Sequence, residues 1–167
     1  AYERELALAV VSVAKAPQLP VASPFGVHSA GLMEMYQTGF KWVRLWDTGD
    51  TWNRHERESK GAFDFSKTAA KVDRFREQGF EVLGVLAYTP AWATTRPDEP
   101  HYTGAGAPYP PKNLADWRDY CREYMTRFRG RIRHFEVWNE PNAGFFKGTA
   151  AEYVALQKVA YEVSREV

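Results

Sequence analysis

Residues 78–88 read QGFEVLGVLAY, a glycine followed by an almost unbroken apolar run. A glycine just past the end of a helix supplies the left-handed residue that caps it. An apolar run without polar alternation is typical of a strand that is covered on both faces, as in a parallel sheet. The segment therefore predicts the end of a helix, a short turn and a buried parallel strand over residues 81–88.

The same junction occurs twice more along the chain. Residues 38–46 read TGFKWVRLW, and residues 129–138 read RGRIRHFEVW. In both, β-prone apolar residues follow the glycine directly. We therefore expect two further strands of this kind and a shorter one near the start, over residues 41–46, 132–138 and 25–28.

The segments between these strands have helical periodicity. Apolar side chains recur at spacings of three and four residues, which predicts helices over residues 32–38, 65–75 and 114–128. Thr149 and Glu152 form a capping-box pattern, from which a last helix is expected to run to about residue 163. Strands and helices thus alternate as four βα units.

Two α/β architectures fit this alternation, a doubly wound sheet and a (β/α)8 TIM barrel. A full barrel takes about 250 residues, so four units in 167 residues amount to half of one. We predict an α/β fold, a (βα)4 half of a TIM barrel with parallel strands, over residues 23–167. Residues 1–22 fit neither pattern and are expected to be a linker or a strand from an upstream region.

Composition excludes several function classes. The net charge of +1 lacks the basic surface that a nucleic-acid partner needs. No membrane association is expected, because the apolar run over residues 6–13 is too short to span a bilayer. The four histidines lack metal-ligand spacing, and phosphate-binding and dinucleotide-binding glycine motifs are missing, so no metal or cofactor is expected. Aromatic residues make up 15% of the chain, which indicates either core packing or stacking against sugar rings.

The most specific chemical signal lies at the end of the fourth predicted strand. There the chain reads FEVWNEPN over residues 135–142. A carboxylate at the carboxyl end of a parallel strand projects into the face where barrel enzymes build their sites. The two longest loops, residues 47–64 and 89–112, follow strands and lie at the same face. Glu140 is therefore the leading candidate for a catalytic group.

This segment resembles clan A of the glycoside hydrolases, in which Asn-Glu-Pro ends the fourth barrel strand. Within the clan the chain is similar to family 39, which groups β-xylosidases, α-L-iduronidases and bacterial exopolysaccharide endoglycosidases. The similarity is carried by GFKWVRL at 39–45, GAFDF at 61–65, YTPAW at 88–92 and WNEPN at 138–142, followed by Phe145-Phe146 and Glu152-Tyr153. It extends over roughly residues 24–165, and family members continue for four more βα units.

The resemblance implies a retaining hydrolase with Glu140 as general acid/base. Its carboxylate nucleophile would lie near the end of a seventh strand, which is absent from this chain. Glu136, deeper in the same strand, is expected to form an ion pair with Arg44 or Arg133. Asp47 and Asp50 follow the second strand, but neither matches the position of the family's nucleophile.

The same resemblance suggests substrate contacts. Asn139 would hydrogen-bond the sugar 2-hydroxyl, and Arg44 would orient the nucleophile. The remaining candidates are a hydroxyl ligand, aromatic platforms and loop residues at the mouth: His28, Tyr88, Trp92, Asp47, Trp52, Asn142, Phe145 and Phe146. For each of these aromatic residues, core packing is the competing interpretation. Trp42, Trp117 and Cys121 are expected to be buried.

Three readings of the function stay open. The first is a glycosidase whose partners are a carbohydrate substrate and the remaining half of the barrel from the same parent chain, with a secreted or periplasmic location. The second is a non-catalytic carbohydrate-binding half-barrel or scaffold. The third is a half-barrel that self-associates through its exposed sheet edges.

Overall fold

The computed structural model describes residues 24–28 and 40–167. Residues 1–22 and the helix predicted over 32–38 lie outside the described residues. The strands are β1 (Gly26–His28), β2 (Trp42–Arg44), β3 (Glu81–Leu86) and β4 (His134–Val137). The helices are α2 (Trp52–His55), α3 (Ser66–Glu77), α4 (Leu114–Arg127) and α5 (Ala150–Glu166). None of the helices described is both long enough and apolar enough to cross a membrane.

The four strands form one parallel sheet in the order β1-β2-β3-β4. Each strand therefore lies beside the strand that precedes it in the chain. A doubly wound sheet reverses its strand order at a switch point, and the described strands contain no such reversal. The arrangement is that of four successive units of a barrel wall, which confirms the predicted fold class.

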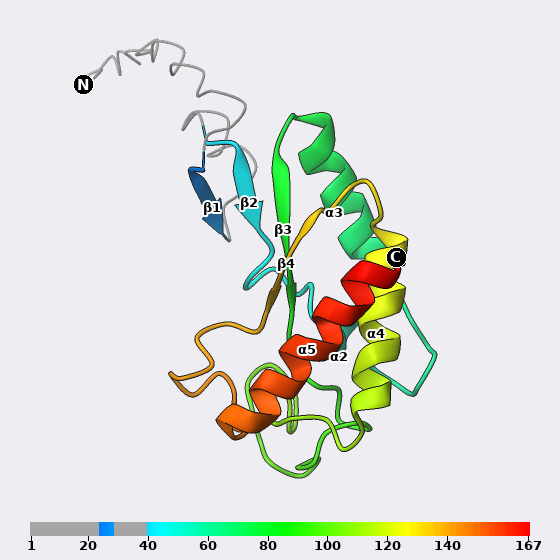
Figure 1. The fold of residues 1–167 in the computed structure, drawn as a ribbon, viewed down its shortest axis with the longest axis vertical. Helices are drawn as coiled ribbons and strands as arrows, with labels where there is room; N and C mark the ends of the chain where they lie inside the picture. The colour runs from blue at the N-terminus through cyan, green and yellow to red at the C-terminus, as the bar shows by residue number, and fades with distance from the viewer. Residues whose placement is uncertain (1–23, 29–39) are drawn as a thin grey trace, which may run out of the picture.

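The two faces of the sheet differ in what covers them. Figure 1 shows α3, α4 and α5 together on one side of the strands. Val43, Val82 and Val137 point to this side and are buried. On the opposite face, which would line a barrel, Trp42, Leu83 and Glu136 are only partly covered, whereas Val85 is buried. Trp42, predicted to be core, is half-buried on this open face, where its ring packs edge-on to the His134 ring at 4.8 Å.

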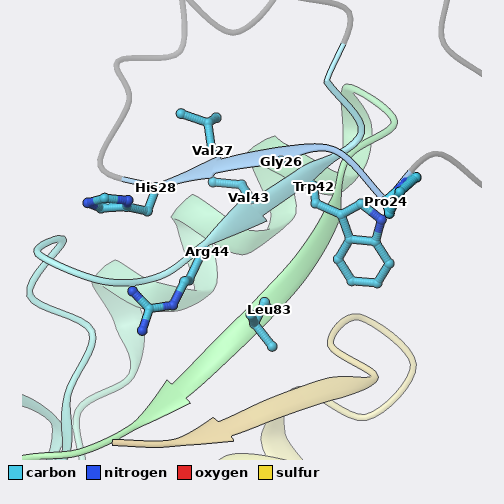
Figure 2. A pocket seen from close by; sticks show the side chains of 8 residues that line it. All are labelled: Pro24, Gly26, Val27, His28, Trp42, Val43, Arg44 and Leu83. Atoms are coloured by element: carbon cyan, nitrogen blue, oxygen red, sulfur yellow. The ribbon is translucent and has the colours of Figure 1, made fainter. Parts of the chain in front are cut away.

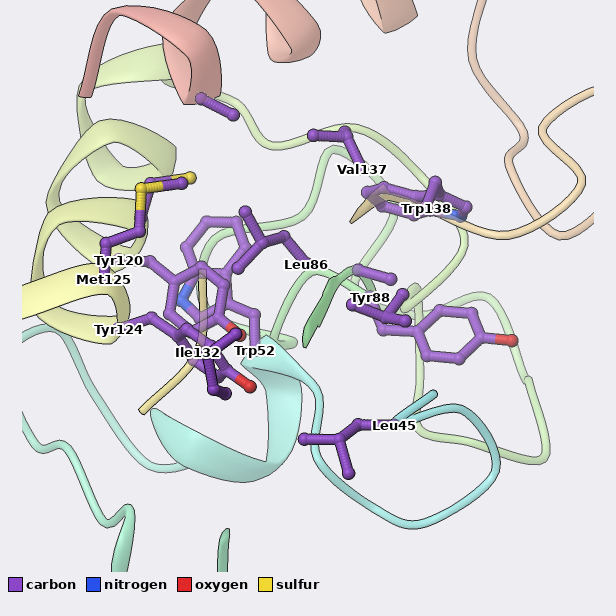
Figure 3. Close-up of a cluster of buried hydrophobic side chains, with 14 of the residues drawn as sticks. Leu45, Trp52, Leu86, Tyr88, Tyr120, Tyr124, Met125, Ile132, Val137 and Trp138 are labelled. Atoms are coloured by element: carbon purple, nitrogen blue, oxygen red, sulfur yellow. The ribbon is translucent and has the colours of Figure 1, made fainter. Parts of the chain in front are cut away.

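The core beneath the helices is mainly aromatic (Figure 3). The rings of Trp52 and Tyr120 stack at 5.3 Å with 16° between their planes, and Trp117 and Tyr124 pack around them. Gly84 makes room for this layer, because a Cβ atom there would lie 3.3 Å from the Tyr124 ring. Burial of Trp117 and Cys121 confirms both predictions.

The helix ends follow the predicted local signals. Gly79 and Gly130 adopt φ values of 81° and 77° after α3 and α4, the left-handed conformation expected of capping glycines. The capping box at the start of α5 is present, with reciprocal hydrogen bonds between Thr149 and Glu152. The strands are shorter than predicted, and the reason lies in the backbone just beyond them.

Candidate active site

The backbone takes an unusual form at the carboxyl ends of three strands. Asp47, Tyr88, Trp138 and Glu140 have φ values of 59°, 61°, 67° and 38°. They are the non-glycine residues with positive φ in the described part of the chain. Such conformations are uncommon in L-residues and cluster at functional sites. Each lies within three residues of the end of β2, β3 or β4, so this edge of the sheet is the candidate site.

The turns after β4 place Asn139 and Glu140 in different surroundings. In a regular strand the two side chains would point to opposite faces of the sheet. β4 ends at Val137, and the positive φ values of Trp138 and Glu140 replace the pleat with a tight turn. Asn139 is consequently buried, and Glu140 is exposed at the carboxyl edge. An exposed carboxyl group thus directly follows a buried amide in the chain.

The Asn139 amide is held by an ion pair that spans the sheet. Arg44 on β2 donates from Nε and Nη2 to the two carboxylate oxygens of Glu136 on β4, at 2.7 and 2.5 Å. Its Nη2 also donates to Asn139 Oδ1 at 2.8 Å. A planar guanidinium matches a carboxylate in this two-bond geometry. The predicted Glu136 ion pair is confirmed, and its partner is Arg44.

The hydrogen bond from Arg44 determines which atoms of the Asn139 amide can bind another molecule. The Asn139 carbonyl is the acceptor used by Arg44, so its NH₂ group must point elsewhere. Within residues 24–28 and 40–167 no acceptor bonds to that NH₂. The side chain can therefore donate to an oxygen of a bound molecule next to Glu140.

A hollow of about 310 Å³ lies on the open face and is lined in part by Arg44. Figure 2 shows the Arg44 and Leu83 side chains on the opposite side of the sheet from Val27. His28 is paired in register with Arg44 and is exposed at the same hollow. His28 and Arg44 thus line the same hollow, and Arg44 is hydrogen-bonded to Asn139.

An aromatic group adjoins the site on the β3 side. Tyr88 packs against Trp46 at 5.3 Å and against Trp138 at 6.1 Å between ring centroids. Burial raises the pKa of the Tyr88 phenol well above its ordinary range, so the hydroxyl keeps its proton. Phe145 lies edge-on to Trp46 at 5.8 Å. These rings form one wall of the carboxyl edge.

Comparison with known proteins gives the same picture of the fold. No family model matches the chain. A β-xylosidase of Caldicellulosiruptor saccharolyticus is 30% identical over 138 residues, which cover 74% of this chain and 28% of the xylosidase. A family 39 glycoside hydrolase from Bacteroides cellulosilyticus superposes with a TM-score of 0.57 at 22% identity, covering 77% of this chain and 24% of that one. The GH53 catalytic domain of Ignisphaera aggregans superposes with a TM-score of 0.54 at 21% identity, covering 93% and 51%.

The chain has the fold of a clan A glycoside hydrolase half-barrel. It spans about a quarter of the length of the curated β-xylosidase that it matches. The half-barrel carries Glu140 and Asn139 at the end of its fourth strand, as predicted. Asp47 and Asn142 are also exposed at the carboxyl edge.

Three predicted aromatic contacts lie elsewhere in the half-barrel. Trp52 is fully buried, and its indole NH donates to the Glu56 carboxylate at 2.6 Å. Trp92 donates to the Glu56 carbonyl at 2.7 Å and packs edge-on to Trp52. Phe146 is buried against Trp138. Complete burial is incompatible with stacking on a sugar, so a direct substrate contact at Trp52 is wrong. Phe146 is buried in the same way, whereas Trp92 is half-buried and packs against the edge of the core.

One buried polar network was missed by the sequence reasoning. His55 Nε2 lies 2.7 Å from Thr68 Oγ1, and its Nδ1 lies 3.2 Å from the Tyr120 hydroxyl. Thr68 donates in turn to Asp50, which also accepts from Lys71 Nζ at 2.5 Å. The network ties the loop after β2 to α3 and α4. The only sequence signal was a polar pair, Thr68 and Lys71, three residues apart on a helix.

Side chains able to bind a metal ion are not grouped together in the part of the half-barrel that the structure describes. No group of three or more His, Cys, Asp or Glu side chains there could hold a metal ion.

Proposed function

We propose that this half-barrel carries the general acid/base of a retaining glycoside hydrolase that acts on oligo- or polysaccharides, with xylosides as the first substrates to test. The observation that carries the proposal is the exposed Glu140 beside the Asn139 amide, which Arg44 holds in place. The similarity to a β-xylosidase supports the choice of sugar.

The proposed mechanism follows from the chemistry of an acetal. Glu140 donates its proton to the glycosidic oxygen as the bond from that oxygen to the anomeric carbon breaks. A second carboxylate attacks the anomeric carbon and forms a glycosyl ester. Glu140, now ionised, then takes a proton from a water molecule that attacks the same carbon and releases the sugar. Its exposed position gives both the leaving group and the water access to the carboxyl group.

Asn139 would contribute a hydrogen bond to the substrate. Its free NH₂ can donate to the sugar 2-oxygen, an interaction that strengthens as positive charge develops at the anomeric carbon. Arg44 acts through Asn139, because its Nη2 fixes the amide orientation. Arg44 is therefore proposed as a positioning residue.

The second carboxylate is proposed to come from a segment that covers the open face of the sheet. Among the described acids near the site, Glu136 pairs with Arg44 and Asp50 pairs with Lys71. Asp47 is exposed and unpaired, but it follows β2 and does not match the position of the family's nucleophile. The open face presents the half-buried Trp42 and Leu83 and the 310 Å³ hollow. The remaining half of the barrel from the same parent chain would cover these side chains, and a second copy is the competing source.

The test uses a protein extended by four further βα units, in which Glu140→Ala is compared with wild type. Two aryl β-xylosides are used, one with a good and one with a poor leaving group. If Glu140 is the acid, the loss of activity should be far larger for the poor leaving group, because only that one needs protonation. Added azide should restore turnover and yield a xylosyl azide of retained configuration, since azide attacks the glycosyl ester without base assistance.

Glu123→Ala, which removes an exposed glutamate on α4, is the matched control and should behave as wild type. Equal losses with both leaving groups, or no azide product, would contradict the proposed role of Glu140. Because Glu136 and Asp50 are held in ion pairs and are not free to act as a nucleophile, a second candidate function is non-catalytic carbohydrate binding. It predicts that the extended protein binds xylo-oligosaccharides and releases no product.

A further inference from the structure

We propose that the loops after β2 and β3 form a sugar subsite next to the Glu140 site, selective for an uncharged ring, with Tyr102 as the stacking platform and Asp47 as the hydroxyl acceptor. This inference rests on the proposed function, because it extends the same carbohydrate site along the carboxyl edge. It concerns a substrate of at least two sugar units.

The subsite is a separate hollow of about 200 Å³. Its lining includes Trp46, Asp47, Arg54, Tyr88 and Tyr102. Pockets for drug-sized ligands usually measure about 300–1,000 Å³, so this hollow suits roughly one sugar ring. The combination of aromatic walls with a few polar groups is typical of small-molecule sites.

Tyr102 is the most exposed large aromatic side chain of the described residues, with 74% of its surface accessible. It is nevertheless held in place, since its ring packs on the His101 ring at 4.4 Å and its hydroxyl lies 3.5 Å from that of Tyr88. The adjacent Thr103 carbonyl accepts from Asn53 Nδ2 at 2.8 Å, which ties the loop to α2. An apolar ring face that is fixed and accessible is suited to the C–H face of a sugar.

Asp47 and Arg54 supply the polar contacts. Both are exposed, and neither side chain has a hydrogen bond or ion pair with the other residues that the structure describes. A carboxylate can accept hydrogen bonds from two neighbouring hydroxyl groups, and a guanidinium can donate to ring or hydroxyl oxygens. The negative charge of Asp47 and the positive charge of Arg54 cancel, so the lining has no net charge. The hollow therefore favours an uncharged sugar over a uronate.

Trp46 connects the subsite to the Glu140 site. Its ring lies 5.5 Å from the Arg44 guanidinium carbon and 5.3 Å from the Tyr88 ring. A ring bound in the hollow is thus separated by one side chain from the Arg44 pair that holds Asn139. A further hollow of about 280 Å³ shares Arg54 and Thr103 with it. The adjoining hollows extend the contact surface and favour an oligosaccharide over a single sugar.

The test measures binding to the 167-residue chain by saturation-transfer NMR titration. The probes are xylotriose, cellotriose and tri-galacturonate, which represent a neutral pentose, a neutral hexose and an acidic sugar. Tyr102→Ala should weaken binding of a neutral trisaccharide by about fivefold or more, the scale expected for a central aromatic contact. Tyr102→Phe keeps the ring and should bind almost as wild type.

Asp47→Asn isolates the charge, because asparagine also tolerates the positive φ of this position. It should weaken binding by roughly threefold to tenfold, since a hydrogen bond to a charged acceptor is stronger than one to a neutral acceptor. Tyr161→Ala on α5 removes a similarly exposed tyrosine far along the chain and is the matched control.

Several outcomes would overturn the proposal: binding of no probe, binding of tri-galacturonate alone, or equal affinities of Tyr102→Ala and Tyr161→Ala. These results are independent of the Glu140→Ala assay. If Glu140→Ala is active and Tyr102→Ala has lost binding, the subsite stands and the proposed catalytic role fails. If Glu140→Ala shows the azide product and Tyr102→Ala binds normally, the catalytic role stands and the subsite is wrong.

Discussion

Acidification should destabilise this half-barrel through His55. The ring is buried between α3 and α4, with both nitrogens engaged by Thr68 and Tyr120. Burial lowers the pKa of His55 from 6.5 to about 4. In the unfolded chain the imidazole would take up a proton near pH 6.5, whereas in the folded chain it stays neutral until about pH 4. The contribution of His55 to the free energy of unfolding is therefore fully present above pH 6.5 and is lost progressively as the pH falls toward 4.

The size of the effect follows from the shift. Each pKa unit corresponds to about 1.4 kcal/mol, so the full loss is about 3 kcal/mol, with about 2 kcal/mol already lost at pH 5. Burial also raises the pKa of Glu56. Its effect on stability is opposite to that of His55, because the folded state binds the Glu56 proton more tightly and is therefore stabilised as the pH falls. A comparison between variants cancels this contribution.

The assay is urea unfolding of the 167-residue chain, followed by tryptophan fluorescence at about pH 7, 6 and 5. His55→Gln should be less stable than wild type at neutral pH, since the ring contact with Phe65 at 4.8 Å is lost. Its free energy of unfolding should then change much less with pH. His134→Gln, which removes an exposed histidine, should keep the wild-type dependence. A wild-type slope in His55→Gln would refute the argument.

Three further predictions concern the sheet, the helix end and the site. Gly84→Ala should cost about 1–3 kcal/mol of unfolding free energy, because the new Cβ atom would press on Tyr124 and Phe135 at 3.3 and 3.2 Å; an unchanged urea midpoint would contradict this. Thr149→Ala removes the capping box and should cost about 1 kcal/mol, measured against Ser164→Ala in the same helix. Arg44→Lys keeps the charge but cannot make the two-bond contact with Glu136. In the extended protein it should lower kcat/KM for an aryl β-xyloside by about tenfold to a hundredfold. Wild-type kinetics would exclude a positioning role for Arg44.

Local patterns in the sequence were sufficient for the elements and for the main catalytic candidate. A capping glycine, a run of β-prone residues or a capping box depends on neighbours within a few positions, so the strands, α3, α4 and α5 could be predicted. Glu140 was found for the same reason, since its motif directly follows a strand. The strand ends were placed too late, because the positive φ values after β2, β3 and β4 leave no clear trace in residue type.

The tertiary structure decided what depends on partners far apart in the chain. Strand order separated a barrel wall from a doubly wound sheet, and alternation of strands and helices is the same in both. The Arg44–Glu136 pair joins residues 92 positions apart, and only the register of three strands brings them together. Whether an aromatic ring faces the core or the surface was equally undetermined: Trp52 is buried and Tyr102 is exposed. Trp and Tyr can both bury a large apolar area, so their burial depends on how the loops fold over the sheet.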